Sequence, residues 1–340
     1  MKYFSVFLLV HIFGLVGCTD LSKEKPFVKE IPIEAKIMQV DSLIGRPFSL
    51  QCLDSYLLVG DLYDGKAITV IDTRTDRFLG RTLTLGGGPG EVMGALRISY
   101  NEEKSELSVY QIQNGTLHIY AIQPKGSISD LLTHKESLHF QDRPFNVVIG
   151  NDNMLSIGVF DKGRFHVYDT DGNFLMPAGD YPFDGNNMRP DIRFALYQGQ
   201  LCSQPNGSNF VLGGSFSDEL EFYTIQNGNL SLIKSYGSKD VLARVEETIK
   251  FDDNCLIGYK GVYGTSQYCY LLYSGKTYGE NADRRTWAKS IHVYNWNGDF
   301  VKSYQMNVEV LAFCVDEKNG VIYGISKHDG EFVLVKFTLP

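Results

Sequence analysis

The sequence lacks runs of basic residues, and its formal net charge is −8 at pH 7. Surfaces that bind nucleic acid rely on clustered lysine and arginine, so we expect no nucleic-acid partner. The GxSxG and HExxH motifs are also missing, and no CxxC pair occurs. The patterns of a nucleophile elbow, a zinc protease and a zinc finger are therefore absent. We expect no bound metal and no other cofactor.

A segment long enough to span a membrane as a helix is missing as well. Residues 4–16 form an apolar stretch behind Lys2, but a spanning helix needs roughly 20 such residues. The length and the basic start indicate a signal peptide. The stretch ends in Leu15-Val16-Gly17-Cys18, which resembles the lipobox of bacterial lipoproteins. This resemblance implies that residues 1–17 are removed and that Cys18 carries the lipid that anchors the protein to the membrane.

The residues after Cys18 bear on tethering and location. Residues 18–32 are polar and charged, which predicts an acylated N-terminus followed by a flexible tether. We expect an outer-membrane lipoprotein of the cell envelope, and the scarcity of acidic residues directly after Cys18 favours its periplasmic face over the cell surface. The alternative is an ordinary secretory signal with a chance cysteine.

Five further cysteines remain, which is an odd number: Cys52, Cys202, Cys255, Cys269 and Cys314. Several lie in apolar, strand-like runs, so we expect small buried thiols. The alternative is that two of these five cysteines form one disulfide.

Helical periodicity is scarce, and strand-like alternation recurs in its place. An apolar-x-apolar-aromatic strand followed by a polar turn returns with a period of about 50 residues. The equivalent positions are Ile71, Tyr120, Tyr168, Tyr223 and Tyr294. This period predicts an all-β fold, a six-bladed β-propeller with four-stranded antiparallel blades. A two-domain β-sandwich is the alternative.

We expect the propeller to span residues 33–340, with units beginning near residues 45, 92, 143, 195, 248 and 308. Residues 37–45 precede the first unit and are expected to add a strand to the last blade, closing the ring. Residues 274–289 lack alternation and predict a long loop inserted in the fifth blade. Residues 240–249 are the best candidate for a short helix, because their apolar side chains fall on one side.

Residues 85–92 read LGGGPGEV and raise the question of a phosphate-binding loop. Neither the GxGxxG nor the GxxxxGK[ST] spacing fits, and no βαβ context surrounds the loop. The stretch Gly86-Gly87-Gly88-Pro89-Gly90-Glu91 instead resembles the G-x-G-P-G-E motif of the TolB-like six-bladed propeller lipoproteins of the Bacteroidota. Members often carry an arginine just before or within the motif, which this chain lacks. The resemblance implies a fold and a location but little mechanism.

The loop has two possible roles. It can simply connect two blades, with Glu91 accepting hydrogen bonds from nearby backbone N–H groups. Alternatively, it contacts a ligand at the channel mouth through Gly86, Gly88, Pro89, Gly90 and Glu91. Further candidate binding residues come from two irregular segments, at 183–194 and in the fifth-blade insertion, since arginine and aromatic side chains commonly anchor interfaces. They are Arg189, Arg193, Arg284, Arg285 and Trp287.

Histidines are scattered, and His118, His166 and His292 share one offset in the repeat, which indicates a repeated structural position. No catalytic residue is predicted. The sequence therefore favours a lipid-anchored binding or scaffold module for an envelope protein or a glycan. The alternative is a carbohydrate-active enzyme, a lyase or hydrolase, that uses the central funnel.

Overall fold

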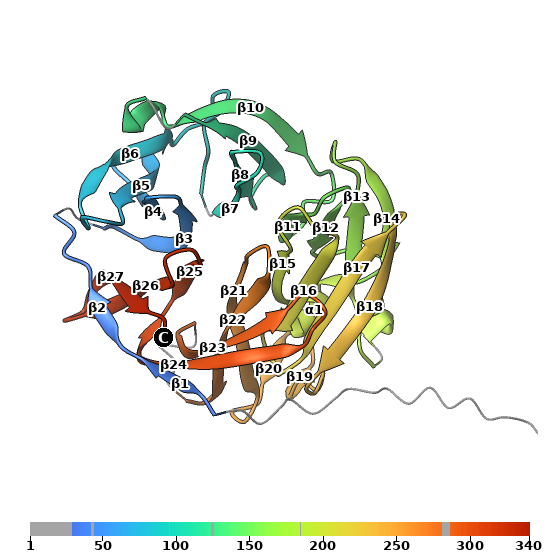
Figure 1. Ribbon diagram of the computed structural model, residues 1–340. Coiled ribbons are helices and arrows are strands. Elements are labelled where there is room, and N and C mark those ends of the chain that lie inside the picture. The colour runs from blue at the N-terminus through green and yellow to red at the C-terminus, as the bar shows by residue number, and fades with distance from the viewer. Residues whose placement is uncertain (1–28, 42–43, 95, 124–125, 184, 281–285) are drawn as a thin grey trace, which may run out of the picture.

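The chain folds into six sheets arranged in a ring around a central axis (Figure 1). The computed structural model describes residues 29–340, except 42–43, 95, 124–125, 184 and 281–285. Consecutive strands within each sheet pair antiparallel, as expected where tight turns join them. The structure is thus the predicted six-bladed β-propeller with four-stranded antiparallel blades.

Each blade has its first strand nearest the axis and its last strand at the rim (Figure 1). Blade 1 contains β3 (Pro47–Leu53), β4 (Tyr56–Tyr63), β5 (Lys66–Asp72) and β6 (Phe78–Thr84). Blade 2 contains β7 (Leu96–Asn101), β8 (Glu106–Gln111), β9 (Thr116–Ile122) and β10 (Leu132–His139), with a 3-10 turn at Ile128–Asp130. Blade 3 contains β11 (Asn146–Ile149), β12 (Met154–Ile157), β13 (Phe165–Tyr168) and β14 (Phe174–Ala178).

The second half of the ring repeats this plan. Blade 4 contains β15 (Gly199–Ser203), β16 (Asn209–Gly214), β17 (Leu220–Gln226) and β18 (Asn229–Tyr236). Blade 5 contains β21 (Leu256–Gly264), β22 (Tyr268–Thr277), β23 (Ala288–Asn295) and β24 (Phe300–Val310). Blade 6 contains β25 (Ala312–Asp316), β26 (Val321–His328) and β27 (Glu331–Thr338). Five of the six innermost strands begin two to four residues after the predicted starts, and β21 begins at Leu256, eight residues after the start predicted near 248.

The N-terminal segment closes the ring, although a few residues earlier than predicted. Strand β2 (Ala35–Ile37) pairs antiparallel with β27 as the fourth strand of blade 6, and Met38 N–H donates to the Leu334 carbonyl. Strand β1 (Ile31–Ile33) pairs parallel with β24, so blade 5 has a fifth strand. Residues 31–32 therefore belong to a strand and not to the expected tether. Ile33 explains this, because it is buried among apolar side chains of blades 5 and 6.

The repeated aromatic residue occupies the equivalent position in each blade that carries it. Tyr120, Tyr168, Tyr223 and Tyr294 each lie on the third strand of a blade and pack into the apolar layer shared with the preceding blade. Ile71 occupies the same place in blade 1, facing blade 6. Each junction between neighbouring blades thus has its own buried core, and burial of these side chains holds the blades together.

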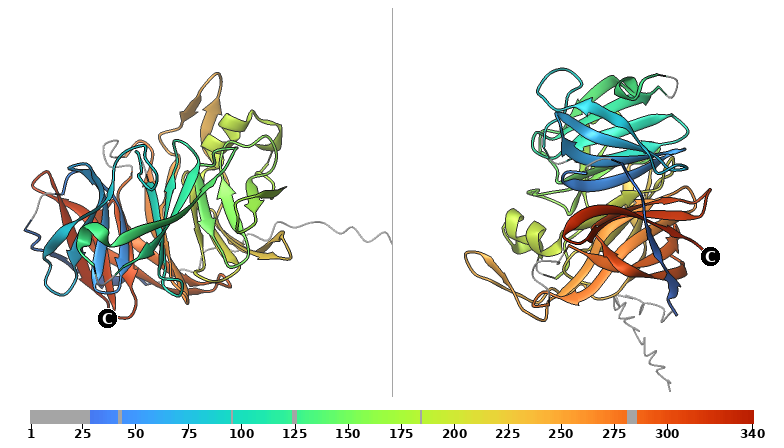
Figure 2. Two further views of the ribbon diagram at one scale, coloured as in Figure 1. Left: turned by 90° about the horizontal axis from the view of Figure 1, so that it is seen from above. Right: turned by 90° about the vertical axis from the view of Figure 1, so that its left-hand side faces the viewer.

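Two connections on one face of the ring depart from the sequence predictions (Figure 2). Residues 240–249 are not a helix, because β19 (Ala243–Val245) and β20 (Ile249–Phe251) form a hairpin. The β-branched pair Val245 and Ile249 lies opposite across this hairpin, and Phe251 stacks on Phe216 with ring centroids 4.2 Å apart.

The segment at 183–194, expected to be irregular, contains a 3-10 turn at Gly185–Asn187 and helix α1 (Pro190–Tyr197). Pro190 occupies the first helical position, where proline is favoured. No helix among the described residues is long and apolar enough to cross a membrane.

The fifth-blade insertion is shorter than predicted. Strand β22 continues to Thr277 and β23 begins at Ala288, so residues 278–287 connect them. Arg284 and Arg285 lie outside the described residues.

Candidate functional site

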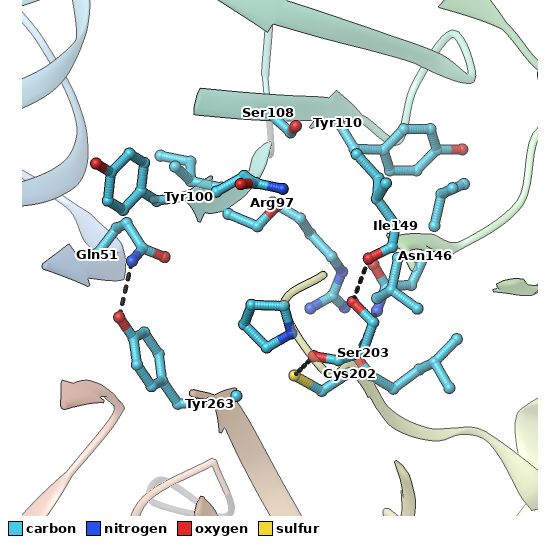
Figure 3. A pocket seen from close by; sticks show the side chains of 18 of the residues that line it. Gln51, Arg97, Tyr100, Ser108, Tyr110, Asn146, Ile149, Cys202, Ser203 and Tyr263 are labelled. Atoms are coloured by element: carbon cyan, nitrogen blue, oxygen red, sulfur yellow. Dashed lines mark hydrogen bonds between the residues drawn. The ribbon is translucent and has the colours of Figure 1, made fainter. Parts of the chain in front are cut away.

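A cavity of about 350 Å³ lies on the axis, and all six innermost strands contribute to its walls (Figure 3). On β7, Leu96 packs into the core shared with blade 1, and Ile98 and Tyr100 pack against that core. Strand alternation turns Arg97 and Ser99 to the other side, where they line the cavity. The volume is at the lower end of the range for small-molecule sites.

The cavity extends outward from the axis between blades 2 and 3. Ser108 and Tyr110 of β8 line one wall, and Val147 and Met154 line the other. Tyr110 donates a hydrogen bond to the Pro144 carbonyl, 2.5 Å away, which ties the two blades together beside this extension. Burial raises the pKa of Tyr110 well above its ordinary value, so its hydroxyl stays protonated and remains a donor.

Neutral polar groups cross-link the walls. The Gln51 side-chain amide donates to the Tyr263 hydroxyl at 2.8 Å, which joins blades 1 and 5 (Figure 3). Ser203 donates to the Ile149 carbonyl at 2.7 Å, and Asn146 donates to the Leu201 carbonyl at 3.1 Å. These bonds fix the inner strands relative to one another, so the cavity is preorganised.

Three cations also line the cavity: Arg97 and the exposed Lys104 from blade 2, and Lys260 from blade 5. The Arg97 guanidinium lies over the Phe145 ring, 5.1 Å from its centroid, and extends toward Asn146 (Figure 3). Lys260 Nζ lies 5.5 Å from the centroid of the Phe216 ring. Burial lowers the pKa of Lys260 to about 8 and lowers that of Arg97 from its ordinary value.

The glycine-rich loop connects β6 to β7 and does not contribute to the cavity walls, which in this part of the chain begin at Leu96. Leu85 and Val92 form a parallel bridge that closes the loop. The Gly88 N–H donates to Glu91 Oε2 at 2.8 Å, as predicted for the connector role. A Cβ at Gly86 would lie 2.1 Å from the same oxygen, which explains the glycine there.

The same loop is bonded to the repeated aromatic. Tyr120 donates a hydrogen bond to the Gly90 carbonyl at 3.2 Å, and Gly90 itself has φ +72. Blade 2 therefore holds the loop that leads into it. Ligand binding by Gly86, Gly88, Pro89, Gly90 and Glu91 stays a prediction.

The arginines of the 183–194 segment differ in their surroundings. Arg189 is exposed and pairs with Asp191 at 2.6 Å. Arg193 is buried, where it donates to the carbonyls of Phe160 and Asp161 and lies over the Tyr181 ring. Arg193 thus links α1 to blade 3 through buried hydrogen bonds and stabilises the packing of this helix.

Trp287 is also buried, and its ring stacks on Phe332 of blade 6 at a centroid distance of 6.4 Å. It anchors the end of the fifth-blade connection.

The three repeated histidines lie on the third strands of their blades, away from the axis: His118 on β9, His166 on β13 and His292 on β23. Among the described residues, no group of three or more His, Cys, Asp or Glu side chains has the arrangement of a metal site. His166 bonds to Asp142, which also accepts from the Tyr168 hydroxyl at 2.7 Å. Burial favours a higher pKa for Asp142, but these two hydrogen bonds hold it below its ordinary value.

Sequence reasoning missed the cavity residues. The pattern Arg97-x-Ser99-x-Asn101 was the available signal, because it gives an innermost strand one wholly polar face. The sequence around Lys260 gave no indication that this residue would line the same cavity, because its position relative to Arg97 depends on closure of the ring.

These features define a class of protein: a six-bladed propeller with an axial cavity lined by both polar and apolar side chains. The chain belongs to the TolB-like 6-blade propeller-like family, whose profile matches residues 26–318. No curated protein matches the sequence.

Solved structures with the same fold include a Bacteroides fragilis protein described as exported. It is 12% identical, with a TM-score of 0.57, and the match covers 94% of this chain and 98% of that one. A member of the DUF4221 family from Bacteroides vulgatus is 11% identical, with a TM-score of 0.52 and coverage of 92% and 98%. The WD40 repeats of RRP9 are 8% identical, with a TM-score of 0.51 and coverage of 90% and 97%. At these identities the likeness concerns the fold alone.

Proposed function

We propose that this chain is a lipid-anchored binding module of the cell envelope that takes its ligand, a glycan or a part of one, in the central cavity. The observation that carries the proposal is the preorganised cavity to which all six innermost strands contribute and in which hydrogen-bonding side chains lie among apolar ones. Hydrogen-bonding side chains mixed with aromatic rings suit a carbohydrate. The lipobox at Leu15–Cys18 supports anchoring through Cys18, and the exported protein of similar fold supports an envelope location.

Attachment is tested by metabolic labelling with a radioactive fatty acid. We expect label on the full chain and none on Cys18→Ala, which should also leave the membrane fraction. Label that persists on Cys18→Ala would contradict anchoring at this residue. Proteinase treatment of intact cells then distinguishes the periplasmic face, where the protein is protected, from the cell surface.

Ligand binding is tested on a glycan array with a variant whose cavity is filled. Ser99 is exposed and lines the cavity, so Ser99→Trp should occupy that space without disturbing the blade cores. We expect wild type to bind a subset of glycans and Ser99→Trp to lose them. Equal binding by a folded Ser99→Trp variant would show that the cavity is not the site. A protein partner recovered by a Ser99→Trp bait would instead favour docking on a surface outside the cavity.

The second candidate is a carbohydrate-active enzyme, for which the Asp142, His166 and Tyr168 cluster is the relevant observation. It brings a carboxylate, an imidazole and a phenol within hydrogen-bond reach, the residue types used in acid–base catalysis. None of the three lines the central cavity, so a substrate would have to approach between blades 2 and 3. Release of reducing ends from an acidic polysaccharide, lost in His166→Phe, would favour this candidate over the binding module.

A further inference from the structure

Two of the three cations that line the cavity, Arg97 and Lys260, are partly buried, and neither has an acidic partner among the described residues. The Arg97 guanidinium lies over the Phe145 ring, and its Nε is buried without a hydrogen-bond acceptor among the described residues. Lys260 is likewise placed against an aromatic ring, and no described carboxylate lies within ion-pairing distance. A buried charge without a partner costs free energy, so its retention calls for a compensating group.

The surrounding charges do not supply that group. The cavity lining includes two glutamates, and Glu106 is ion-paired with Lys135 while Glu136 is exposed. The chain as a whole is acidic, with a net charge of −8, so these cations do not belong to a generally basic surface. Both line the axial cavity of an acidic protein, and positive charge there favours an anionic ligand.

Neutral donors complete the site. The side chains of Gln200, Ser99 and Ser108 line the cavity and form no hydrogen bond with another described residue. They can therefore bond to a ligand at no cost to the fold, in contrast to Gln51 and Asn146, whose amides cross-link the walls. A planar guanidinium suits bidentate recognition of a carboxylate or phosphate, and an ammonium adds a second charge.

We propose that the central cavity binds an oxyanion carried by a small ligand, with Arg97 as the principal contact and Lys260 as the second cation. The inference rests on the proposed function and narrows it to an acidic ligand, such as a carboxylate-bearing or phosphate-bearing sugar. A volume of about 350 Å³ suits one such sugar unit.

Calorimetric titration of residues 19–340, which lack the proposed lipid site, tests this at pH 7 with glucuronate, inorganic phosphate and glucose as probes. We expect at least one of the two anions to bind more tightly than glucose. Whether glucuronate or phosphate has the higher affinity tells whether the site prefers a carboxylate or a phosphate. Arg97→Met should weaken that anion about tenfold to a hundredfold, the usual range for losing a hydrogen bond to a charged group. Arg97→Lys should restore part of the affinity, and Lys260→Met should weaken binding less.

Matched controls exclude a general effect of removing charge. Arg77→Met and Lys318→Met each delete an exposed cation that does not line the cavity and should bind as wild type does. Unfolding curves show whether each variant is folded. The proposal is overturned if both anions bind no more tightly than glucose, or if folded Arg97→Met keeps full anion affinity.

The two proposals fail in different ways. Glucose that binds as tightly as glucuronate, and is lost in Ser99→Trp, would leave the cavity as a binding site but refute its preference for anions. Anion binding that is unchanged in Ser99→Trp would place the site elsewhere and refute the proposed function.

Discussion

The sulfur atoms of Cys52 and Cys314 lie 3.0 Å apart, one on β3 of the first blade and the other on β25 of the last. Both strands are innermost, so the contact lies at the junction where the ring closes. Burial raises the pKa of the Cys314 thiol well above its ordinary value, so this sulfur is a poor thiolate at neutral pH.

We expect oxidised glutathione to convert this pair into a disulfide. The thiol of Cys52 forms a mixed disulfide with one glutathione and releases the other, and Cys314 then displaces the remaining glutathione as a second thiol. The ring would be closed covalently, and the midpoint of thermal unfolding should rise. Peptide mapping after alkylation in denaturant should show the pair linked and Cys202, Cys255 and Cys269 alkylated. Full alkylation of all five cysteines would contradict the prediction.

The affinity for an anion should fall as pH rises through about 8. Burial lowers the pKa of Lys260 to this value, and among the described residues the Cys255 thiol is the titratable group that acts on it, in the opposite direction. Below pH 8 Lys260 is charged and attracts the ligand, whereas above it the amine is neutral. Titrations between pH 7 and pH 9 should show this loss in wild type. If the anion affinity of Lys260→Met falls over this pH range as much as that of wild type, a group other than Lys260 is responsible.

A buried ion cluster between blades 3 and 4 should carry a large share of stability. Arg164 forms two hydrogen bonds with Glu219, at 2.8 and 2.9 Å, and a third with Glu221 at 2.8 Å. The charges of the two glutamates outweigh burial and raise the pKa of Arg164 above its ordinary value.

Arg164→Met leaves both carboxylates buried without this partner, so we expect a loss of about 3–5 kcal/mol in urea unfolding. The exposed pair Arg189 and Asp191 provides the control, because Arg189→Met should cost no more than about 1 kcal/mol. Equal losses of unfolding free energy in the two variants would show that the buried cluster stabilises the fold no more than an exposed ion pair does.

Gly90→Ala should separate the connector role of the glycine-rich loop from ligand binding. Gly90 has φ +72, and a Cβ there would lie 2.8 Å from the Cβ of His134. We expect a loss of about 1–3 kcal/mol from backbone strain together with crowding against His134, with anion affinity unchanged. Gly65→Ala is the matched control, since its φ is +69 but nothing lies within 4 Å of the added carbon. Anion binding lost in folded Gly90→Ala would instead support a loop that contacts the ligand.

The sequence alone predicted the fold well because its signal is repeated. Tyr120, Tyr168, Tyr223 and Tyr294 recur because each blade needs one large side chain against the preceding blade. Single segments have no such support, and the hairpin at 243–251 shows the consequence. Its apolar residues have a spacing compatible with a helix, but Leu242 and Val245 are exposed, so no buried face holds a helix there.

The candidate site was not predictable in the same way. Arg97 and Lys260 are 163 positions apart in the sequence, and each lies in an ordinary alternating strand. They line one cavity only because the ring closes and turns the inner faces of blades 2 and 5 to the axis. Arg193 and Trp287 show the reverse case, since their residue types suggested a binding rim while local packing buries both side chains.

A crystal structure of the protein soaked with glucuronate tests the central claim most directly. We expect density for the sugar within the axial cavity, with its carboxylate within hydrogen-bond distance of the Arg97 guanidinium. A cavity that holds only water, with the sugar bound at the outer loops or not bound at all, would contradict the claim.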